Sequence, residues 1–181
     1  MLQLSRDSSD FAPYLISPVT NKTAFVVAFT QRNNKPPLSQ IFNYTVGSIP
    51  KPILPQPMNG TVPTEIVHDR VLDRVWFLAG ENLSYYDSKL NTTVTEHTFT
   101  GDSPFYMAID HNERIWLTFP YSNRVAGYDP FSKQFSFYTA PSPEAGPEGI
   151  AIGPDNSVWF AEPNGTKIGH IACLQLSCNV S

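Results

Sequence analysis

Two glutamates in the last quarter of the chain are the side chains whose type and spacing best suit chemistry. Glu148 and Glu162 stand fourteen residues apart, one before and one at the end of short apolar runs typical of β-strands. If those strands bring the carboxylates together, the pair could hold a hard cation such as Mg²⁺ or Ca²⁺, which prefers oxygen ligands. Alternatively, one glutamate lies in a turn, the other ends a strand, and water solvates both.

The sequence contains no complete catalytic set. His170 could serve as a general base, but it falls on a predicted strand where a surface position is the alternative. No G-x-S-x-G, HExxH, P-loop or GxGxxG motif is present. The missing catalytic set favours a non-enzymatic role, with an enzyme as the alternative.

The two cysteines, Cys173 and Cys178, predict a disulfide bond. A turn in the four residues between them would close a small loop, and two free thiols are the alternative. A zinc site would need further ligands, and the four histidines are widely separated. Those histidines are His68, His97, His111 and His170. A disulfide is typical of an oxidising compartment.

The chain contains more Asn-x-Ser/Thr sequons than its composition predicts by chance. Seven of the twelve asparagines lie in this context, whereas chance predicts about two. The sites are Asn21, Asn43, Asn59, Asn82, Asn91, Asn164 and Asn179. We interpret them as acceptors of N-linked glycans, with accidental sequons in a Ser/Thr-rich chain as the alternative. Glycans would supply a hydrophilic coat to a protein in which only 15% of residues are charged.

Charge and hydropathy restrict the partners and the location. The net charge is -4 and the Lys and Arg residues are spread singly, which argues against nucleic acid as a partner. No stretch approaches the roughly 20 apolar residues of a membrane span. With the sequons and the cysteines, this predicts an extracellular or cell-surface protein. Because no signal peptide is visible, either it has been removed or the chain is part of a longer one.

An internal repeat predicts the fold. Three tryptophans recur in the same frame, at Trp76, Trp116 and Trp159. A turn precedes each by six or seven residues, at Asp69, Asp110 and Gly153. Short apolar strands flank each turn, and further strands come after them, so each unit of about 42 residues holds four strands. The prediction is an all-β chain of four-stranded antiparallel blades from a β-propeller, in which the tryptophans anchor each blade and are buried between neighbouring blades.

The repeat divides the chain into four blades, expected at residues 11–58, 60–100, 103–140 and 145–181, within a single domain or fragment spanning residues 1–181. The first is degenerate, with Phe25 in the tryptophan frame. Its last strand, around residues 48–52, is expected to be poor because proline cannot donate to a strand ladder. Two short turns, at His111-Asn112 and Asp155-Asn156, are of the kind that tolerates positive φ.

One blade carries a family resemblance. The run GPEGIAIGPDNSVWFAE at residues 146–162, followed by KIGHI at residues 167–171, resembles the repeat of the virginiamycin B lyase (streptogramin lyase) family. The resemblance implies a propeller, usually of seven blades, and a metal-assisted lyase with a His base and a Glu metal ligand. Glu162 matches that Glu, whereas Glu148 stands where the family has His. Phe105 and Phe119 occupy the two positions in the preceding blade.

Two functions of different class are compatible with these features. The first is a secreted or cell-surface, N-glycosylated module that binds other extracellular proteins or a cell-envelope assembly. The alternative is a Mg-dependent lyase or a hydrolase acting at the propeller axis. A sugar-binding propeller is a third possibility, based on tyrosines expected to be exposed, such as Tyr121.

Four blades are expected to leave open sheet faces, which native proteins avoid. A small four-bladed propeller, closure with a second chain, or a longer chain of six or seven blades would each remove them. The last of these is the expectation from the sequence.

Overall fold

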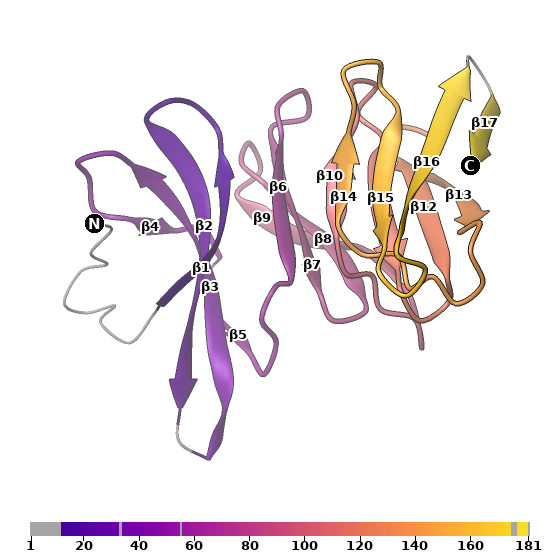
Figure 1. The fold of residues 1–181 in the computed structure, drawn as a ribbon. Coiled ribbons are helices and arrows are strands. Elements are labelled where there is room, and N and C mark those ends of the chain that lie inside the picture. The colour runs from indigo at the N-terminus through magenta and orange to yellow at the C-terminus, as the bar shows by residue number, and fades with distance from the viewer. Residues whose placement is uncertain (1–11, 33, 55, 175–176, 181) are drawn as a thin grey trace. The chain divides into compact units, whose positions relative to one another are not determined.

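The computed structural model describes residues 12–32, 34–54, 56–174 and 177–180, and all regular elements among them are β-strands (Figure 1). The predicted all-β class is therefore confirmed. The described part of the chain has no helix that is long and apolar enough to cross a membrane. The chain forms two compact units, Met1–Thr98 and Phe99–Ser181, and each holds two antiparallel sheets. The predicted grouping of residues 1–181 into one domain stays a prediction.

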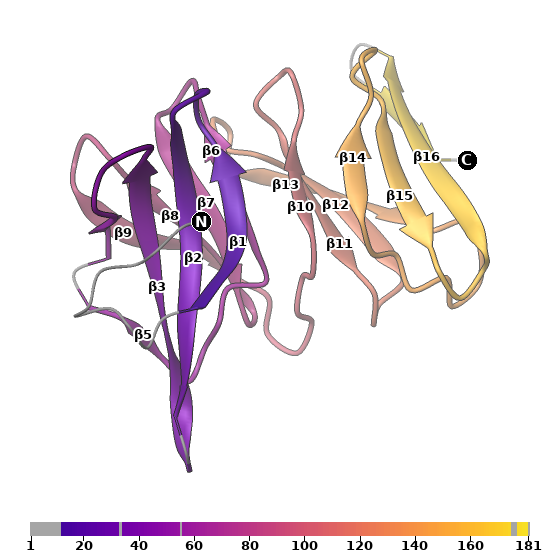
Figure 2. The same cartoon turned by 60° about the vertical axis from the view of Figure 1, so that its left-hand side comes forward.

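The first unit contains two sheets, which we call blade 1 and blade 2. Blade 1 comprises β1 (Ala12–Pro18), β2 (Thr23–Arg32), β3 (Lys35–Thr45), β4 (Lys51–Pro52) and β5 (Met58–Asn59). Blade 2 comprises β6 (Glu65–Asp69), β7 (Arg74–Ala79), β8 (Asn82–Asp87) and β9 (Thr92–Thr98). In blade 2 each strand pairs with the next along the chain, as in a propeller blade (Figure 2).

Blade 1 departs from this pattern where the sequence predicts a weak strand. Two short strands, β4 and β5, pair with different parts of β3 in place of one continuous fourth strand. Pro52 lies in β4, and the backbone nitrogen of proline has no hydrogen to donate. The edge strand therefore stops after two residues. Blade 1 is irregular at this edge, and its predicted bounds, residues 11–58, stay a prediction.

The second unit contains blades 3 and 4. Blade 3 comprises β10 (Met107–Ile109), β11 (Ile115–Phe119), β12 (Arg124–Asp129) and β13 (Gln134–Thr139). Blade 4 comprises β14 (Ile150–Ile152), β15 (Val158–Glu162), β16 (Lys167–Leu174) and β17 (Ser177–Val180). Both run in sequence order, so three of the four sheets have the predicted four-stranded blade topology. Of the two predicted positive-φ turns, one has positive φ at Asn156, and the other has it at Glu113 instead of Asn112.

Each blade has two different faces, because side chains alternate along its second strand. We call the face that carries the tryptophan, or Phe25 in blade 1, the tryptophan face, and the opposite face the valine face. In the first unit, Phe25 and Val27 of blade 1 pack in one cluster with Val75 and Phe77 of blade 2. The tryptophan face of blade 1 therefore covers the valine face of blade 2.

The second unit repeats this packing. Trp116 and Val125 of blade 3 share a buried cluster with Val158, Phe160 and Ile171 of blade 4. Here too the tryptophan face of one blade covers the valine face of the next. Burying an aromatic side chain against a neighbouring apolar face contributes on the order of 2–3 kcal/mol.

The indole N–H of each buried tryptophan is bonded to the turn aspartate that precedes it. Trp76 Nε1 donates to Asp69 Oδ2 at 3.3 Å, and Trp116 Nε1 donates to Asp110 Oδ2 at 2.8 Å. The other oxygen, Oδ1, accepts backbone N–H groups of the turn, from Val71 and Leu72 in blade 2. One carboxylate therefore fixes the turn and satisfies a donor that burial removes from water.

Blade 4 reaches the same result with different residues. Gly153 stands where blades 2 and 3 have aspartate, and Trp159 Nε1 donates to Ser157 Oγ at 2.9 Å. Ser157 in turn bonds Asp155, and hydrogen bonds from the Ser157 side chain and backbone lower the pKa of Asp155. A Cβ on residue 153 would lie 2.7 Å from Ser157 Oγ and 2.8 Å from Asp155 Oδ1. Only glycine leaves room for this arrangement.

The predicted burial of the three tryptophans is correct for two of them. Trp76 and Trp116 are fully buried, whereas 45% of Trp159 is exposed. Within the described part of the second unit, no sheet comes after blade 4 to pack on its tryptophan face. The expectation of burial is therefore wrong for Trp159 in this structure, although its strand position matches that of the other two.

The two cysteines face each other across the last hairpin. Cys173 on β16 and Cys178 on β17 are direct register partners in the antiparallel pair. Opposite residues in such a pair have Cα atoms roughly 4.5–5.5 Å apart, within the range that a disulfide spans. The disulfide bond stays a prediction, and the side chains of Cys173 and Asn179 lie outside the described residues.

The bond between Asp110 and Trp116 can be tested separately from the turn. In the variant Asp110→Asn, Oδ1 can still accept the N–H groups of Asn112 and Arg114, but the new amide nitrogen cannot accept the indole N–H. We expect a loss of about 1–3 kcal/mol in the free energy of unfolding, measured by urea denaturation, because a buried donor is left unsatisfied. In a Trp116→Phe background, which lacks the N–H, the same change should cost clearly less. Equal costs in both backgrounds would contradict the role assigned to the bond.

Candidate functional site

The candidate site is a hollow of about 230 Å³ in the second unit, at one end of blades 3 and 4. Its lining comes from the loops that enter the first strand and leave the second strand of each blade. These residues are Phe105, Pro120 and Tyr121 from blade 3, and Gly146, Glu148, Pro163 and Asn164 from blade 4. Loops held by a rigid sheet are a common place for binding residues.

A set of amide contacts fixes the loop that enters blade 4. Asn123 donates from Nδ2 to the carbonyl of Ser142 at 2.9 Å and accepts the N–H of Gly146 at Oδ1, at 3.2 Å. Asn164 Nδ2 donates to the carbonyl of Glu144 at 3.0 Å. Gly146 has a φ of 60°, and a Cβ on it would lie 2.8 Å from Asn164 Nδ2. Glycine therefore suits this position, because a side chain would collide with the Asn164 amide that holds the loop.

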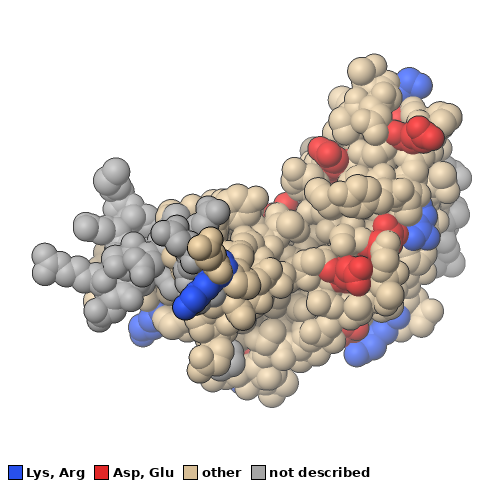
Figure 3. All heavy atoms as spheres, turned by 90° about the horizontal axis from the view of Figure 1, so that it is seen from below, with Lys and Arg blue, Asp and Glu red and all other residues tan. Residues whose placement is uncertain are grey.

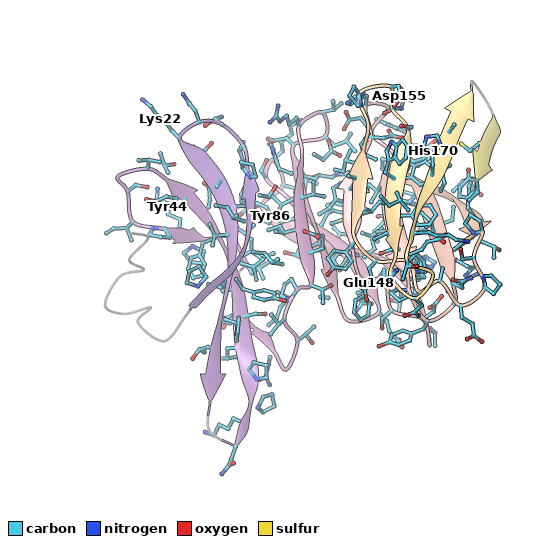
Figure 4. All side chains as sticks on the ribbon, in the orientation of Figure 1. Lys22, Tyr44, Tyr86, Glu148, Asp155 and His170 are labelled. Atoms are coloured by element: carbon cyan, nitrogen blue, oxygen red, sulfur yellow. The ribbon has the colours of Figure 1, made fainter. Side chains whose placement is uncertain are left out.

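Glu148 lies on the loop before β14, and its side chain is exposed (Figure 4). Its backbone N–H donates to the carbonyl of Ala161 at 3.0 Å, which extends the pairing of β14 and β15 by one bond. The glutamate therefore stands at the rim of the hollow on a fixed backbone. Its position agrees with a turn glutamate and also leaves the carboxylate free to meet a ligand.

Glu162 ends β15 and is 99% buried, on the valine face beside Phe160. Its Oε1 atom has no hydrogen-bond partner among the described residues. The corresponding strand positions hold Ala79 in blade 2 and Phe119 in blade 3, both buried. Glu162 is thus a carboxylate at a position that the other blades use for apolar packing. Of the two alternatives weighed from the sequence, the solvated strand-end glutamate is wrong for Glu162, because burial excludes water from the side chain.

The described residues contain no group of three or more His, Cys, Asp or Glu side chains that could together hold a metal ion. Glu148 and Glu162 both lie at the hollow end of blade 4, one exposed and one buried. The metal site predicted at this pair stays a prediction. Two carboxylates alone would leave most of the coordination sphere of Mg²⁺ or Ca²⁺ to water or a ligand.

His170 belongs to a different part of blade 4. It lies directly opposite Trp159 in the pairing of β15 and β16, and the two rings are in contact, with centroids 4.3 Å apart and planes tilted by 37°. Tyr85 takes the same position against Trp76 in blade 2, at 4.7 Å. Figure 4 shows His170 toward the Asp155 end of the blade, away from Glu148. His170 therefore does not join the glutamates, and its role as a general base gains no support.

The aromatic residues of the hollow are the part that sequence reasoning largely missed. The rings of Phe105 and Tyr121 meet edge to face, with centroids 5.8 Å apart. Tyr121 is 79% exposed, which confirms the exposure expected from the sequence. Phe105 entered that reasoning only as a substitution in the lyase pattern. The sequence signal that could have indicated this site is an aromatic residue just before the first strand of blade 3, Phe105, and another just after its second strand, Tyr121.

Most of the surface visible in Figure 3 is uncharged. Figure 3 shows one face of the molecule, on which acidic and basic side chains are sparse and of mixed sign. No strong electrostatic field of one sign is visible on that face to select a highly charged ligand. An uncharged, partly apolar partner suits this surface better.

The sequon asparagines are mostly at the surface. Five of the six whose side chains are described are exposed, and the sixth, Asn82, is half-buried. The exposed ones are Asn21, Asn43, Asn59, Asn91 and Asn164. Asn82 Oδ1 accepts a hydrogen bond from Thr98 Oγ1 at 2.7 Å, and Asn91 Oδ1 accepts one from Tyr86 at 2.9 Å. In both cases the side-chain nitrogen that a glycan would use is not the atom in that bond.

No protein-family model and no curated protein matches the sequence. Solved structures do match. Virginiamycin B lyase from Staphylococcus aureus superposes with a TM-score of 0.72 at 18% identity, over 98% of this chain and 57% of the lyase. The chain therefore spans little more than half the length of that protein.

Proteins with other roles match as well. The extracellular domain of the one-component system BT4673 from B. thetaiotaomicron has a TM-score of 0.64 at 13% identity, over 91% of this chain and 22% of that domain's chain. YCF48 bound to D1 peptide has a TM-score of 0.63 at 15% identity, over 93% of this chain and 49% of YCF48.

These likenesses define the class of the fold, a β-propeller. The predicted fold class is confirmed, and the resemblance to the virginiamycin B lyase repeat is confirmed at the level of structure. At these identities the likeness concerns the fold alone, since one propeller scaffold serves many activities.

Proposed function

We propose that the chain is a secreted or cell-surface, N-glycosylated propeller module that binds another extracellular protein or a cell-envelope assembly. The hollow end of blades 3 and 4 is its binding surface. The observation that carries the proposal is the combination of exposed sequons with a hollow lined by aromatic side chains.

The hollow has the chemistry of a peptide-binding surface. Phe105 and Tyr121 offer apolar area with one polar hydroxyl, and Glu148 and Asn164 supply acceptors and donors at the rim. Aromatic side chains of this kind are enriched at the centres of protein interfaces. A volume of about 230 Å³ suits one or two side chains of a partner better than a whole small-molecule ligand. The structure of YCF48 with a bound peptide is an example of a similar fold that binds a polypeptide.

Removal of Tyr121 should weaken peptide binding. Peptides selected from a random phage-displayed library on the wild-type protein are expected to bind Tyr121→Ala at least about tenfold more weakly, measured by biolayer interferometry, because an exposed aromatic anchor is lost. Phe131→Ala is the matched control, since Phe131 is exposed but lies in the turn between β12 and β13. Selected peptides that bind both variants like the wild type would place the binding surface elsewhere.

The glycan coat can be mapped directly. When the chain is expressed through a eukaryotic secretory pathway, we expect N-glycans at Asn21, Asn43, Asn59, Asn91 and Asn164, detected by glycosidase treatment and peptide mass spectrometry. These five side chains are exposed, as glycan attachment requires in the folded protein. Asn82 is half-buried and should be the least occupied of the six described sites. A secreted product without glycans at these sites would contradict the proposal.

A second candidate function is a metal-dependent lyase or hydrolase. It is supported by Glu162, a buried carboxylate with an oxygen that has no partner among the described residues, and by its likeness to the Glu of the lyase pattern. Mg²⁺ or Ca²⁺ held by Glu162 and Glu148 would polarise a substrate oxygen. The exposed position of Glu148 and the contact of the His170 ring with Trp159 speak against it.

Calorimetric titration separates the two functions. Under the binding proposal we expect no saturable heat when Mg²⁺ or Ca²⁺ is added at millimolar concentration, because two carboxylates without further ligands hold these ions poorly. Saturable binding that is lost in both Glu162→Gln and Glu148→Gln would instead establish the metal site. Glu144→Gln is the control, because Glu144 is an exposed carboxylate outside the lining of the hollow.

A further inference from the structure

Asn164 belongs both to a sequon and to the candidate binding hollow. It is the first residue of Asn164-Gly165-Thr166, in the turn between β15 and β16. Its side chain is exposed and lines the hollow at the end of blades 3 and 4. The other sequon asparagines whose side chains are described are not part of this lining. Among these residues, Asn164 is therefore the one whose glycan would be attached to the hollow itself.

The side-chain nitrogen of Asn164 is held at a fixed place beside the hollow. Nδ2 donates to the carbonyl of Glu144 at 3.0 Å, and a Cβ on Gly146 would lie only 2.8 Å from it. Gly146 is itself part of the lining, so this nitrogen lies next to the wall of the hollow. A group bonded to Nδ2 therefore starts at the rim.

N-glycosylation is compatible with the hydrogen bond that holds Asn164. In the transfer, a bond forms between Nδ2 and C1 of the first sugar, and the bond between C1 and the pyrophosphate of a lipid-linked donor breaks. The side-chain amide has two hydrogens, and its nitrogen gives up one of them as a proton. The remaining hydrogen can still be donated to the Glu144 carbonyl. The amide can therefore keep its position in the folded protein while it carries a glycan.

The hollow is too small for a sugar and a peptide side chain at the same time. Its volume is about 230 Å³, which suits one or two side chains of a partner. Its aromatic lining comes from Phe105 and Tyr121 of blade 3, and Tyr121 is 79% exposed. The ring of Tyr121 thus offers a surface on which the apolar face of a sugar can pack. A glycan that starts at Asn164 competes with a partner for this surface.

We propose that a glycan on Asn164 blocks the binding hollow, so that the protein binds its peptide partner in the form that carries no glycan at this residue. The inference rests on the proposed function, because it concerns the regulation of the same hollow. The fraction of molecules glycosylated at this one sequon then sets the fraction that can bind.

Two substitutions of Thr166, the third residue of the sequon, form a matched pair for the test. Thr166→Ala removes the sequon and leaves Asn164 in place, whereas Thr166→Ser keeps the sequon. Thr166 is exposed and has a φ of 51°, a conformation that is less favourable for a β-branched residue than for alanine or serine. Both variants should therefore keep the fold, which circular dichroism checks.

The probes are peptides selected on unglycosylated wild-type protein whose binding is weakened by Tyr121→Ala. Wild type, Thr166→Ala and Thr166→Ser are made in one eukaryotic secretory pathway, and peptide mass spectrometry measures the glycan at Asn164. By biolayer interferometry, we expect Thr166→Ala to bind like the unglycosylated protein, and the forms glycosylated at Asn164 to bind at least about tenfold more weakly, because the aromatic anchor is covered. A column of the same peptides should retain wild-type molecules without this glycan and release those that carry it.

The possible failures of this inference and of the proposed function are distinguishable. Equal or tighter binding by Thr166→Ser glycosylated at Asn164, compared with Thr166→Ala, would overturn the inference and leave the peptide-binding function standing. If the unglycosylated protein selects no peptide that depends on Tyr121, the proposed function fails and the inference fails with it. A secreted wild-type protein with glycans at other sequons and none at Asn164 would also overturn the inference, since nothing would then block the hollow.

Discussion

A buried indole must find an acceptor for its N–H group, and this requirement links the parts of each blade. In blades 2 and 3 one aspartate, in the turn between the first two strands, meets it. The same carboxylate accepts backbone N–H groups of the turn, so the turn, the strand register and the tryptophan position are set together. The indole can then lie in an apolar interface without the cost of about 1–3 kcal/mol that an unsatisfied buried donor carries.

Much of the fold can be predicted from sequence because the need to bond each indole N–H produces a regular spacing of tryptophans and turns. The recurrence of tryptophan with a turn six or seven residues earlier predicts the four-stranded unit, and Pro52 predicts the weak edge of blade 1. The aspartate–indole bond is harder to predict, since the sequence shows the aspartate as a turn residue and says nothing of its second oxygen. In blade 4 the acceptor is Ser157, which no spacing rule indicates.

The candidate site was less predictable, because the sequence does not show which face of the blade each side chain points to. Glu148 and Glu162 do lie at one end of the same blade, as their placement before and after two paired strands implies. Alternation along β15 turns Glu162 into the valine face, whereas the loop exposes Glu148. Trp159 is a similar case, because its sequence frame equals that of Trp76 and Trp116 while its exposure depends on whether another sheet packs on its face.

Because the two faces of each blade differ, the blades within a unit pack in one direction only, with the tryptophan face of the earlier blade on the valine face of the later one. A unit that exposes a tryptophan face at one end and a valine face at the other is a self-compatible building block. Duplication of such a unit in a gene would create a new junction of the kind already present, with no need for compensating substitutions elsewhere. A mutation that exchanged the two faces of a single blade would instead disrupt its packing on the other blade of its unit.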